Sequence, residues 1–294
     1  MSREQAKTPG SESFLEGALR RLIRDKAALA GTAIILALIV LAVFAPWVTS
    51  HDPVKQDFGR LLTAPSWEYP LGTDQYGRDV LTRIIYGCRY ALIIGLAVSA
   101  IHLVIGVVLG LLAGYYGSWV ETVIMRLTDV MLSIPSVVLA VVLAGFLGGG
   151  VQNVIIAVGA IGWRAYTRLV RAEVLSTKEE TFVEAARAIG CSDLRIMFRH
   201  VLPYTLGPVI AYTSLGVATA ILWAAALSFL GLGAQPPTPE WGAMLADGRE
   251  YMADAWWIAT FPGLAIMVTV LGFNFFGDAL RDTLDPKAEG RLRE

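Results

Sequence analysis

The chain alternates between long apolar stretches and short polar connections. A helix needs roughly 20 mostly apolar residues to cross the hydrocarbon core of a bilayer, which is about 30 Å thick. Six stretches come close to that length, so the pattern predicts an all-α polytopic membrane protein with about six transmembrane helices. The predicted helices span residues 27–48, 90–113, 123–146, 151–170, 206–230 and 257–280.

The composition agrees with a membrane protein. Of the 294 residues, 55% are hydrophobic, which exceeds the roughly 45–50% typical of soluble domains. The formal net charge is −1, so no overall positive field is available to attract nucleic acid. The two cysteines, Cys88 and Cys191, are predicted on opposite sides of the bilayer and could not pair.

Lysine and arginine are concentrated in three connections: the N-terminal tail, the segment 164–203 and the C-terminal tail. An even number of spans places all three on one side, and their positive charge assigns that side to the cytoplasm. Arg78, Arg83 and Arg89, before the second span, run against this rule but are outnumbered. We therefore predict a multi-pass protein whose N- and C-termini are both cytoplasmic.

These assignments divide the chain into four parts. Residues 1–26 form a cytoplasmic tail, 27–89 the first transmembrane helix with an external loop, 90–285 a five-helix core, and 286–294 a second cytoplasmic tail. Within the first tail, apolar residues at helical spacing stand beside arginines, as in a helix that lies along the membrane interface. A tail that merely contains leucines explains the same residues and stays open. The apolar residues are Phe14, Leu15, Leu19, Leu22 and Ile23.

The segment 181–203 has the most specific pattern of the predicted cytoplasmic side. Thr181 and Glu184 have the spacing of a capping box, which would start a helix at Thr181, while Thr177 with Glu180 offers a start one turn earlier. Helical periodicity then places four residues on one narrow face, which could seat closely in a groove of a partner protein. These four residues are Phe182, Ala185, Ala186 and Ile189.

The end of this predicted helix is also marked. Gly190 is expected to break the helix or to take a positive φ. Ser192 or Asp193 could cap a second short helix, which Pro203 would end just before the fifth span. A rigid helix held at both ends by membrane spans can transmit the motion of a soluble partner. From spacing alone, an ordinary amphipathic connector is an equally good interpretation.

Four segments together resemble the peptide/nickel branch of ABC importer permeases, and in particular the "C"-type permease of dipeptide and oligopeptide importers. The first joins Glu184, Ala185, Ala186 and Gly190 to Leu202 and Pro203. The others read LGTDQYGRD at 71–79, LSFLGLG at 227–233, and FFGDALRD at 275–282 followed by LDP at 284–286. The resemblance covers nearly all of residues 20–286.

The resemblance implies the type I fold of an ABC importer permease in a bacterial-type cytoplasmic (inner) membrane. The cargo of such importers includes dipeptides, oligopeptides, glutathione and nickel complexes. The implied partners are a homologous permease, two cytoplasmic ABC ATPase subunits and an extracytoplasmic substrate-binding protein. The residues implied to couple to the ATPase are Phe182, Glu184, Ala185, Ala186, Ile189, Gly190, Leu202 and Pro203.

The chain carries no nucleotide-binding or catalytic motif of the common kinds. None of its five lysines follows a glycine, which excludes a P-loop. The three histidines, His51, His102 and His200, are far apart in the sequence and predict no metal site. We therefore expect neither a cofactor nor enzymatic activity in this chain, and we assign ATP and Mg to the partner ATPase subunits.

Polar residues inside the predicted spans are candidates for a pathway or gate, because ionised groups are costly in a bilayer. Asp129 stands three residues after Arg126, which predicts an ion pair along one helix face that could be purely structural. Trp223 and Asn274 are further pathway candidates. His102 is expected to pack through a hydrogen bond.

Two other features concern packing. Glycines at four-residue spacing in the second span predict close approach of a neighbouring helix. They are Gly106, Gly110 and Gly114. The loop 233–256 could either dip back as a short re-entrant helix or remain on the surface.

Two other functions are considered. A secondary transporter driven by an ion gradient would need a charged relay within the spans, for which Asp129 is the single acidic candidate. An intramembrane enzyme would need two catalytic groups at one depth, and the sequence offers no convincing pair. The ATP-driven importer therefore remains the leading hypothesis.

Overall fold

The computed structural model describes residues 25–284, and the regular elements within this range are all helical. The predicted interfacial segment 14–23 and the tail 286–294 lie outside it. The elements are α2 (Lys26–Val48), α3 (Val80–Tyr116), α4 (Ser118–Ser133), α5 (Ser136–Leu147), α6 (Val151–Thr177), α7 (Thr181–Ala188), α8 (Asp193–Ile196), the π-helical turn η1 (Met197–Val201), α9 (Leu202–Phe229), α10 (Trp241–Gly248), the 3₁₀ turn η2 (Arg249–Tyr251) and α11 (Trp257–Leu284).

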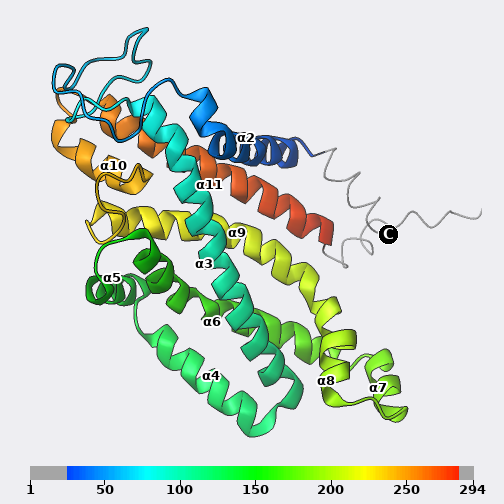
Figure 1. Ribbon diagram of the computed structural model, residues 1–294. Helices are drawn as coiled ribbons and strands as arrows, with labels where there is room; N and C mark the ends of the chain where they lie inside the picture. Colours follow the sequence, from blue (N-terminus) through cyan, green and yellow to red (C-terminus); the bar gives the residue numbers. More distant parts are fainter. Residues whose placement is uncertain (1–24, 285–294) are drawn as a thin grey trace, which may run out of the picture.

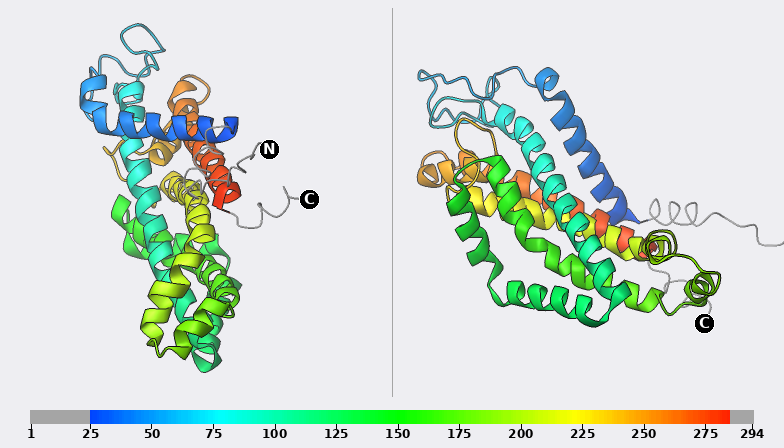
Figure 2. Two further views of the ribbon diagram at one scale, coloured as in Figure 1. Left: turned by 90° about the vertical axis from the view of Figure 1, so that its right-hand side faces the viewer. Right: turned by 60° about the horizontal axis from the view of Figure 1, so that its bottom comes forward.

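The long helices form an elongated bundle (Figure 1). The most extensive packing joins α3 to α6, and α11 lies between α9 and α2. One end of the bundle carries the long loop 49–79 together with α10, and we call it the loop end (Figure 2). The opposite end carries α7 and α8, and we call it the α7 end. At about 1.5 Å per residue, the 37 residues of α3 reach about 55 Å, which is enough to connect the two ends.

Fewer helices than six are apolar enough to cross a membrane by themselves. Four pass by length and composition: α2, α3, the continuous helical path Asp193–Phe229 and α11; the bent pair α4 and α5 makes five if it is one span. The predicted fourth span corresponds to α6, which carries Arg164, Arg168 and Arg171 on 27 residues. Because α6 packs against α3, α9 and α5, Arg164 is buried among its neighbours, whereas Arg168 remains exposed. The all-α membrane fold is thus confirmed, while the number of clearly apolar spans is smaller than predicted.

The predicted third span, 123–146, is broken in the middle. Helices α4 and α5 meet at an angle of 88°. Proline lacks the backbone N–H of a helical residue and forces the preceding residue into an extended conformation. Ile134, before Pro135, accordingly has a ψ of 127°. Pro135 therefore turns what the apolar pattern presents as one rod into two helices.

The three glycines of α3 face α6, as their spacing predicts. A Cβ atom at Gly110 would lie 2.6 Å from Cβ of Val170, and one at Gly114 would lie 2.7 Å from Cβ of Val174. Gly106 meets Tyr166 in the same way, four residues earlier along both helices. These glycines let the two backbones approach more closely than any side chain would permit.

Buried charges and indoles hold the loop end together. The Arg78 guanidinium donates to Oδ2 of Asp74 at 2.6 Å, and both side chains are almost fully buried. The indole N–H of Trp257 donates to the carbonyl of Thr73, and that of Trp241 donates to the carbonyl of Ile84 on α3. The loop 233–256 is therefore more than a surface loop, because its helix α10 packs against α9 and α11.

Candidate functional site

Helix α7 ends in a tight turn that depends on Gly190. The N–H of Cys191 donates to the carbonyl of Ala186 at 3.1 Å, and that of Gly190 donates to the carbonyl of Arg187 at 2.9 Å. This pair of bonds is the Schellman motif, in which the residue after the helix takes a left-handed conformation. Gly190 has a φ of +79°, which confirms the prediction for this residue.

Helix α7 begins at Thr181, as predicted, but without the predicted capping box. Thr181 is the first helical residue and Glu180 occupies the N-cap position, with no side chain capping the helix. The capping box from Thr181 to Glu184 therefore does not form. The reason is the short linker, since only three residues, 178–180, separate α7 from the end of α6 and the turn is already made by Glu180 bonding to the Thr177 carbonyl at 3.1 Å.

One residue of the docking face predicted for α7 packs on this chain instead. Val183 is completely buried and Ala186 is 4% exposed, and both belong to an apolar cluster with residues of α3, α6 and η1. Phe182 stacks on Tyr204 at 4.6 Å between ring centroids. Ala186, expected on the docking face, is thus covered by its own chain. A short helix resting on a bundle must bury one apolar stripe, and Val183 with Ala186 supplies it.

A second set of side chains, between Glu184 and Phe198, is exposed. Ile189 is 81% exposed, Leu194 63% and Phe198 58%. Glu184 and Ala185 are also exposed. We call these five residues the α7–α8 surface. Exposed apolar side chains concentrated in one short segment mark a site of interaction with another macromolecule.

The α7–α8 segment is tied to the end of α3. The Tyr115 hydroxyl donates to Oδ1 of Asp193 at 2.7 Å, and the Lys178 ammonium donates to the Gly114 carbonyl at 3.1 Å. The Arg187 guanidinium lies 5.6 Å from the centre of the Tyr115 ring. These contacts attach α7 and α8 to the end of α3.

The predicted helix end at Pro203 is also wrong. The chain continues from α8 through η1 into α9 without a break. Within a regular α-helix, the Pro203 ring would clash with the carbonyl four residues earlier. The π-helical turn Met197–Val201 lies just before Pro203 and includes Arg199, whose carbonyl would be the obstacle. Leu202 and Pro203 therefore begin α9 instead of closing a separate helix.

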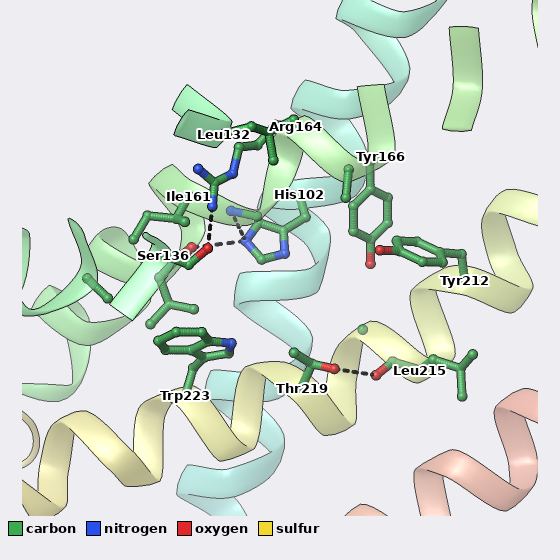
Figure 3. A pocket seen from close by; sticks show the side chains of 15 residues that line it. His102, Leu132, Ser136, Ile161, Arg164, Tyr166, Tyr212, Leu215, Thr219 and Trp223 are labelled. Atoms are coloured by element: carbon green, nitrogen blue, oxygen red, sulfur yellow. Dashed lines mark hydrogen bonds between the residues drawn. The ribbon is translucent and has the colours of Figure 1, made fainter. Parts of the chain in front are cut away.

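A cavity of about 290 Å³ lies near the middle of the bundle (Figure 3). Its walls come from α3, α6, α9 and the break between α4 and α5. Of the predicted pathway residues, Trp223 lines it, whereas Asp129 and Asn274 do not. The sequence did not single out Arg164, Tyr166 or Ser136 as wall residues, because the broken helix that brings them together was predicted to be straight.

His102 packs as predicted, since its Nε2 lies 3.0 Å from the Val158 carbonyl of α6. Asn274 is half-buried on α11. Asp129 is exposed and pairs with Arg168 of α6 at 2.6 Å, not with Arg126 of its own helix. The sequence pointed to the nearest arginine along the helix, whereas the bend at Pro135 brings α4 alongside α6.

A second ion pair joins the same two helices. Nε of Arg171 donates to Oε1 of Glu121 at 2.8 Å. These two pairs border a second, more open hollow of about 560 Å³ between α4 and α6. They cross-link α4 to α6 on the α7 side of the Pro135 break.

Two carboxyl groups at the loop end, those of Glu240 and Asp247, have a raised pKa. Glu240 caps α10 by accepting from the N–H groups of Gly242 and Ala243, and burial raises the pKa of its carboxyl although these bonds oppose the shift. Burial likewise raises the pKa of Asp247, which lies 3.9 Å from the Arg78 guanidinium. Both carboxyl groups belong to the buried contacts of the loop end. Among the residues that the structure describes, no cluster of potential metal ligands occurs.

A family model for binding-protein-dependent transport system inner membrane components matches residues 106–290, which include the α7–α8 segment and every residue that lines the central cavity except His102. The chain belongs to this family. A second model, for the N-terminal transmembrane domain of oligopeptide transport permease C, matches residues 13–65. Membership makes the chain the permease subunit of an ABC importer in an inner membrane, and it argues against the ion-driven transporter considered above.

Curated relatives cover almost the whole chain. A dipeptide transport system permease protein DppC of Alkalihalophilus pseudofirmus is 47% identical over 96% of this chain and 91% of its own length. A di/tripeptide permease DppC of Pseudomonas aeruginosa is 48% identical over 90% of this chain and 89% of its own. A glutathione permease GsiD of Escherichia coli O157:H7 is 44% identical over 98% of this chain and 93% of its own.

A solved structure shares the fold at much lower identity. In an inward-facing structure of the MetNI methionine ABC transporter, one chain superposes with a TM-score of 0.55 at 19% identity. The match covers 70% of this chain and 97% of the other. The likeness supports the type I importer permease architecture that the sequence resemblance implied.

Proposed function

We propose that this permease imports peptides or closely related small solutes, with both termini and the α7 end in the cytoplasm. It forms one half of the translocation pathway, and a homologous permease forms the other. Two cytoplasmic ATPase subunits bind and hydrolyse ATP with Mg, and an extracytoplasmic binding protein delivers the solute to the loop end. The family supports the importer, and the dipeptide, di/tripeptide and glutathione names of the relatives support the class of cargo.

The observation that carries the coupling role is the exposed α7–α8 surface on a helix fixed to the bundle. Ile189, Leu194 and Phe198 are exposed. On the opposite side of the same segment, Val183 and Ala186 are buried against the bundle. A docking surface on a rigid support passes movement on instead of absorbing it. Glu184, Ala185 and Ile189 therefore contact an ATPase subunit directly, whereas Ala186 and Gly190 position that contact.

The charge pattern supports the orientation. The segment around α7 carries Arg171, Lys178, Arg187, Arg195 and Arg199, as expected for a cytoplasmic connection. The tails at 1–26 and 286–294 are basic as well. Nothing in this proposal requires the chain itself to hold a nucleotide, because the energy comes from the partner subunits.

The test of docking uses an exposed residue. Ala185→Arg places a long charged side chain on the α7–α8 surface without disturbing the buried stripe. The matched control is Ala253→Arg, at an alanine of the loop end that is also exposed. We expect Ala185→Arg to abolish co-purification of the ATPase subunits and peptide uptake, and Ala253→Arg to retain ATPase binding. Normal ATPase binding and uptake by Ala185→Arg would overturn the docking assignment.

A further inference from the structure

We propose that the central cavity is a transit subsite for the terminal carboxylate of a peptide, and that Arg164 is its anion-binding group. This inference rests on the proposed function and adds a recognition step inside the membrane. It concerns the cavity between α3, α6, α9 and the α4–α5 break (Figure 3). Arg164 lies near the middle of α6, so the site is about halfway along this helix.

Arg164 is a buried cation without an acidic partner. Its residue is 4% exposed, and its guanidinium donates to the Met131 carbonyl and, at 2.6 Å, to the Ser136 hydroxyl. Among residues 25–284 no aspartate or glutamate forms an ion pair with it. A charge inside a bilayer is expensive unless it is paired, and such residues often mark the path of a substrate.

The other arginines of α6 show the contrast. Arg168 lies about one helical turn from Arg164 toward the α7 end and pairs with Asp129. Arg171 lies about one turn further on and pairs with Glu121. Neither lines the central cavity. The single arginine of α6 that faces the cavity is thus the one whose charge is not neutralised by the described part of the chain.

The two neutral contacts of Arg164 join α4 to α5 and leave other N–H groups of the guanidinium free of contacts within residues 25–284. Met131 lies in the last turn of α4, where carbonyl groups lack a helical partner, and Ser136 is the first residue of α5. Arg164 therefore links the end of α4 to the start of α5. A guanidinium has five N–H donors in a planar fork, which suits a carboxylate. The two contacts occupy only part of this fork, and neutral oxygens do not cancel the charge.

A tyrosine of α6 forms part of the cavity wall. Tyr166 is 2% exposed, lines the cavity, and packs edge-on against Tyr212 of α9 with 4.9 Å between the ring centroids. Thr219 and Tyr212 on α9 add polar atoms to the same wall.

The remaining walls are apolar and fit the rest of a peptide end. Leu132, Ile161, Leu215 and Trp223 line the cavity around the polar groups (Figure 3). A volume of about 290 Å³ is at the lower limit for small-ligand pockets, which are mostly apolar with a few convergent polar groups. The cavity therefore suits the last residue or two of a peptide, and the remainder would extend toward the partner permease.

The experiment measures occupancy directly. Thr219→Cys is introduced in a Cys191→Ser background, and its reaction with a water-soluble thiol reagent is followed in the complex of both permeases and the ATPases, without the binding protein. Alanyl-alanine is compared with its C-terminal amide. At ten times its dissociation constant, alanyl-alanine should slow labelling about tenfold, since roughly a tenth of the sites stay empty. The amide should protect far less.

Two controls define the outcome. Thr122→Cys, in the hollow beside the α4–α6 ion pairs, should label equally with either compound. Adding Arg164→Gln to Thr219→Cys should remove the difference between acid and amide, whereas Arg164→Lys should keep part of it. Equal protection by the amide, absence of protection, or an unchanged preference in Arg164→Gln would overturn the inference.

The comparison of acid and amide needs no substitution at Arg164, so it decides the matter even if Arg164→Gln fails to fold. Peptide uptake by the unsubstituted importer is measured alongside. If uptake is ATP-dependent but the Thr219→Cys variant is unprotected, the subsite fails and the proposed function stands. If the importer carries no peptide at all, the proposed function fails.

Discussion

Two buried arginines, Arg78 and Arg164, show how differently the same residue type can be used in one chain. Arg78 at the loop end lies 2.6 Å from the Asp74 carboxylate, so its charge is paired within the fold. Arg164 in the bundle is held by neutral oxygen atoms. Paired buried charge belongs to the structure, whereas unpaired buried charge beside a cavity points to a ligand.

Loss of the Arg78 pair should destabilise the loop end strongly. Arg78→Met removes the closer of the two buried arginines beside Asp74 and leaves Arg83 at 3.6 Å, so we expect a cost of up to the about 3–5 kcal/mol typical of a broken buried pair. Unfolding can be followed by thiol labelling of Cys88, which is 2% exposed in the native protein. We expect the midpoint of thermal labelling to fall clearly in Arg78→Met.

The matched control is Arg60→Met. Arg60 also forms a short ion pair, with Glu68, but both side chains are about half exposed to solvent. Exposed pairs contribute little because water solvates the separated charges. The labelling midpoint of Arg60→Met should therefore match the unsubstituted protein. Equal midpoints for the two variants would show that the Arg78 pair does not secure the loop.

At the scale of helices, close packing of α3 on α6 is the feature most open to a simple test. Gly110→Ala would put a Cβ atom 2.6 Å from Cβ of Val170 and 2.8 Å from the Thr167 carbonyl. The two helices would have to move apart, and overpacking of this kind typically costs about 1–3 kcal/mol. We expect reduced thermal stability in detergent and a lower yield of the assembled importer.

Gly145→Ala on α5 is the corresponding control. A Cβ atom there would meet nothing within 4 Å, and alanine is favoured over glycine in a helix by about 1 kcal/mol. Its stability should be unchanged or higher. A Gly110→Ala protein as stable as Gly145→Ala would mean that α3 and α6 are not held together at this point.

The helices differ in how well the sequence predicts them. The apolar stretches locate α2, α3, α9 and α11, and the glycine spacing identifies the α3 surface that meets α6. The 88° angle at Pro135 could not be predicted, because proline fixes where a helix breaks but not the direction in which the chain continues. The partner of Asp129 and the walls of the cavity depend on that direction, so they could not be predicted from the sequence either.

The α7–α8 segment shows a finer limit of the same kind. Its position and the role of Gly190 follow from the sequence, whereas the orientation of α7 does not. Both Phe182–Ala185–Ile189 and Val183–Ala186 are spaced for one side of a helix, and only packing on the bundle decides which side is covered. The proposed docking face therefore keeps Ala185 and Ile189 and loses Ala186.

For the whole molecule, the α7 end connects to three of the helices that form the walls of the central cavity, α3, α6 and α9. A linker of three residues joins α7 to α6, the path α8–η1–α9 is unbroken, and Tyr115 ties α8 to α3. A push on the α7–α8 surface would therefore reach α3, α6 and α9 together. These three helices carry His102, Arg164 and Thr219 around the cavity.

The link between Tyr115 and Asp193 gives a test of this transmission. Tyr115→Phe keeps the ring near Arg187 but removes the 2.7 Å bond to the Asp193 carboxylate, of a kind worth about 1.5–3 kcal/mol. The importer should assemble and hydrolyse ATP, while the peptide imported per ATP falls severalfold, because α8 moves without drawing α3 along. The control is Tyr116→Phe, whose more exposed neighbouring ring should leave the ratio unchanged. An unchanged ratio in Tyr115→Phe would place the transmission in α6 and α9 alone, since these helices continue directly into the α7–α8 segment.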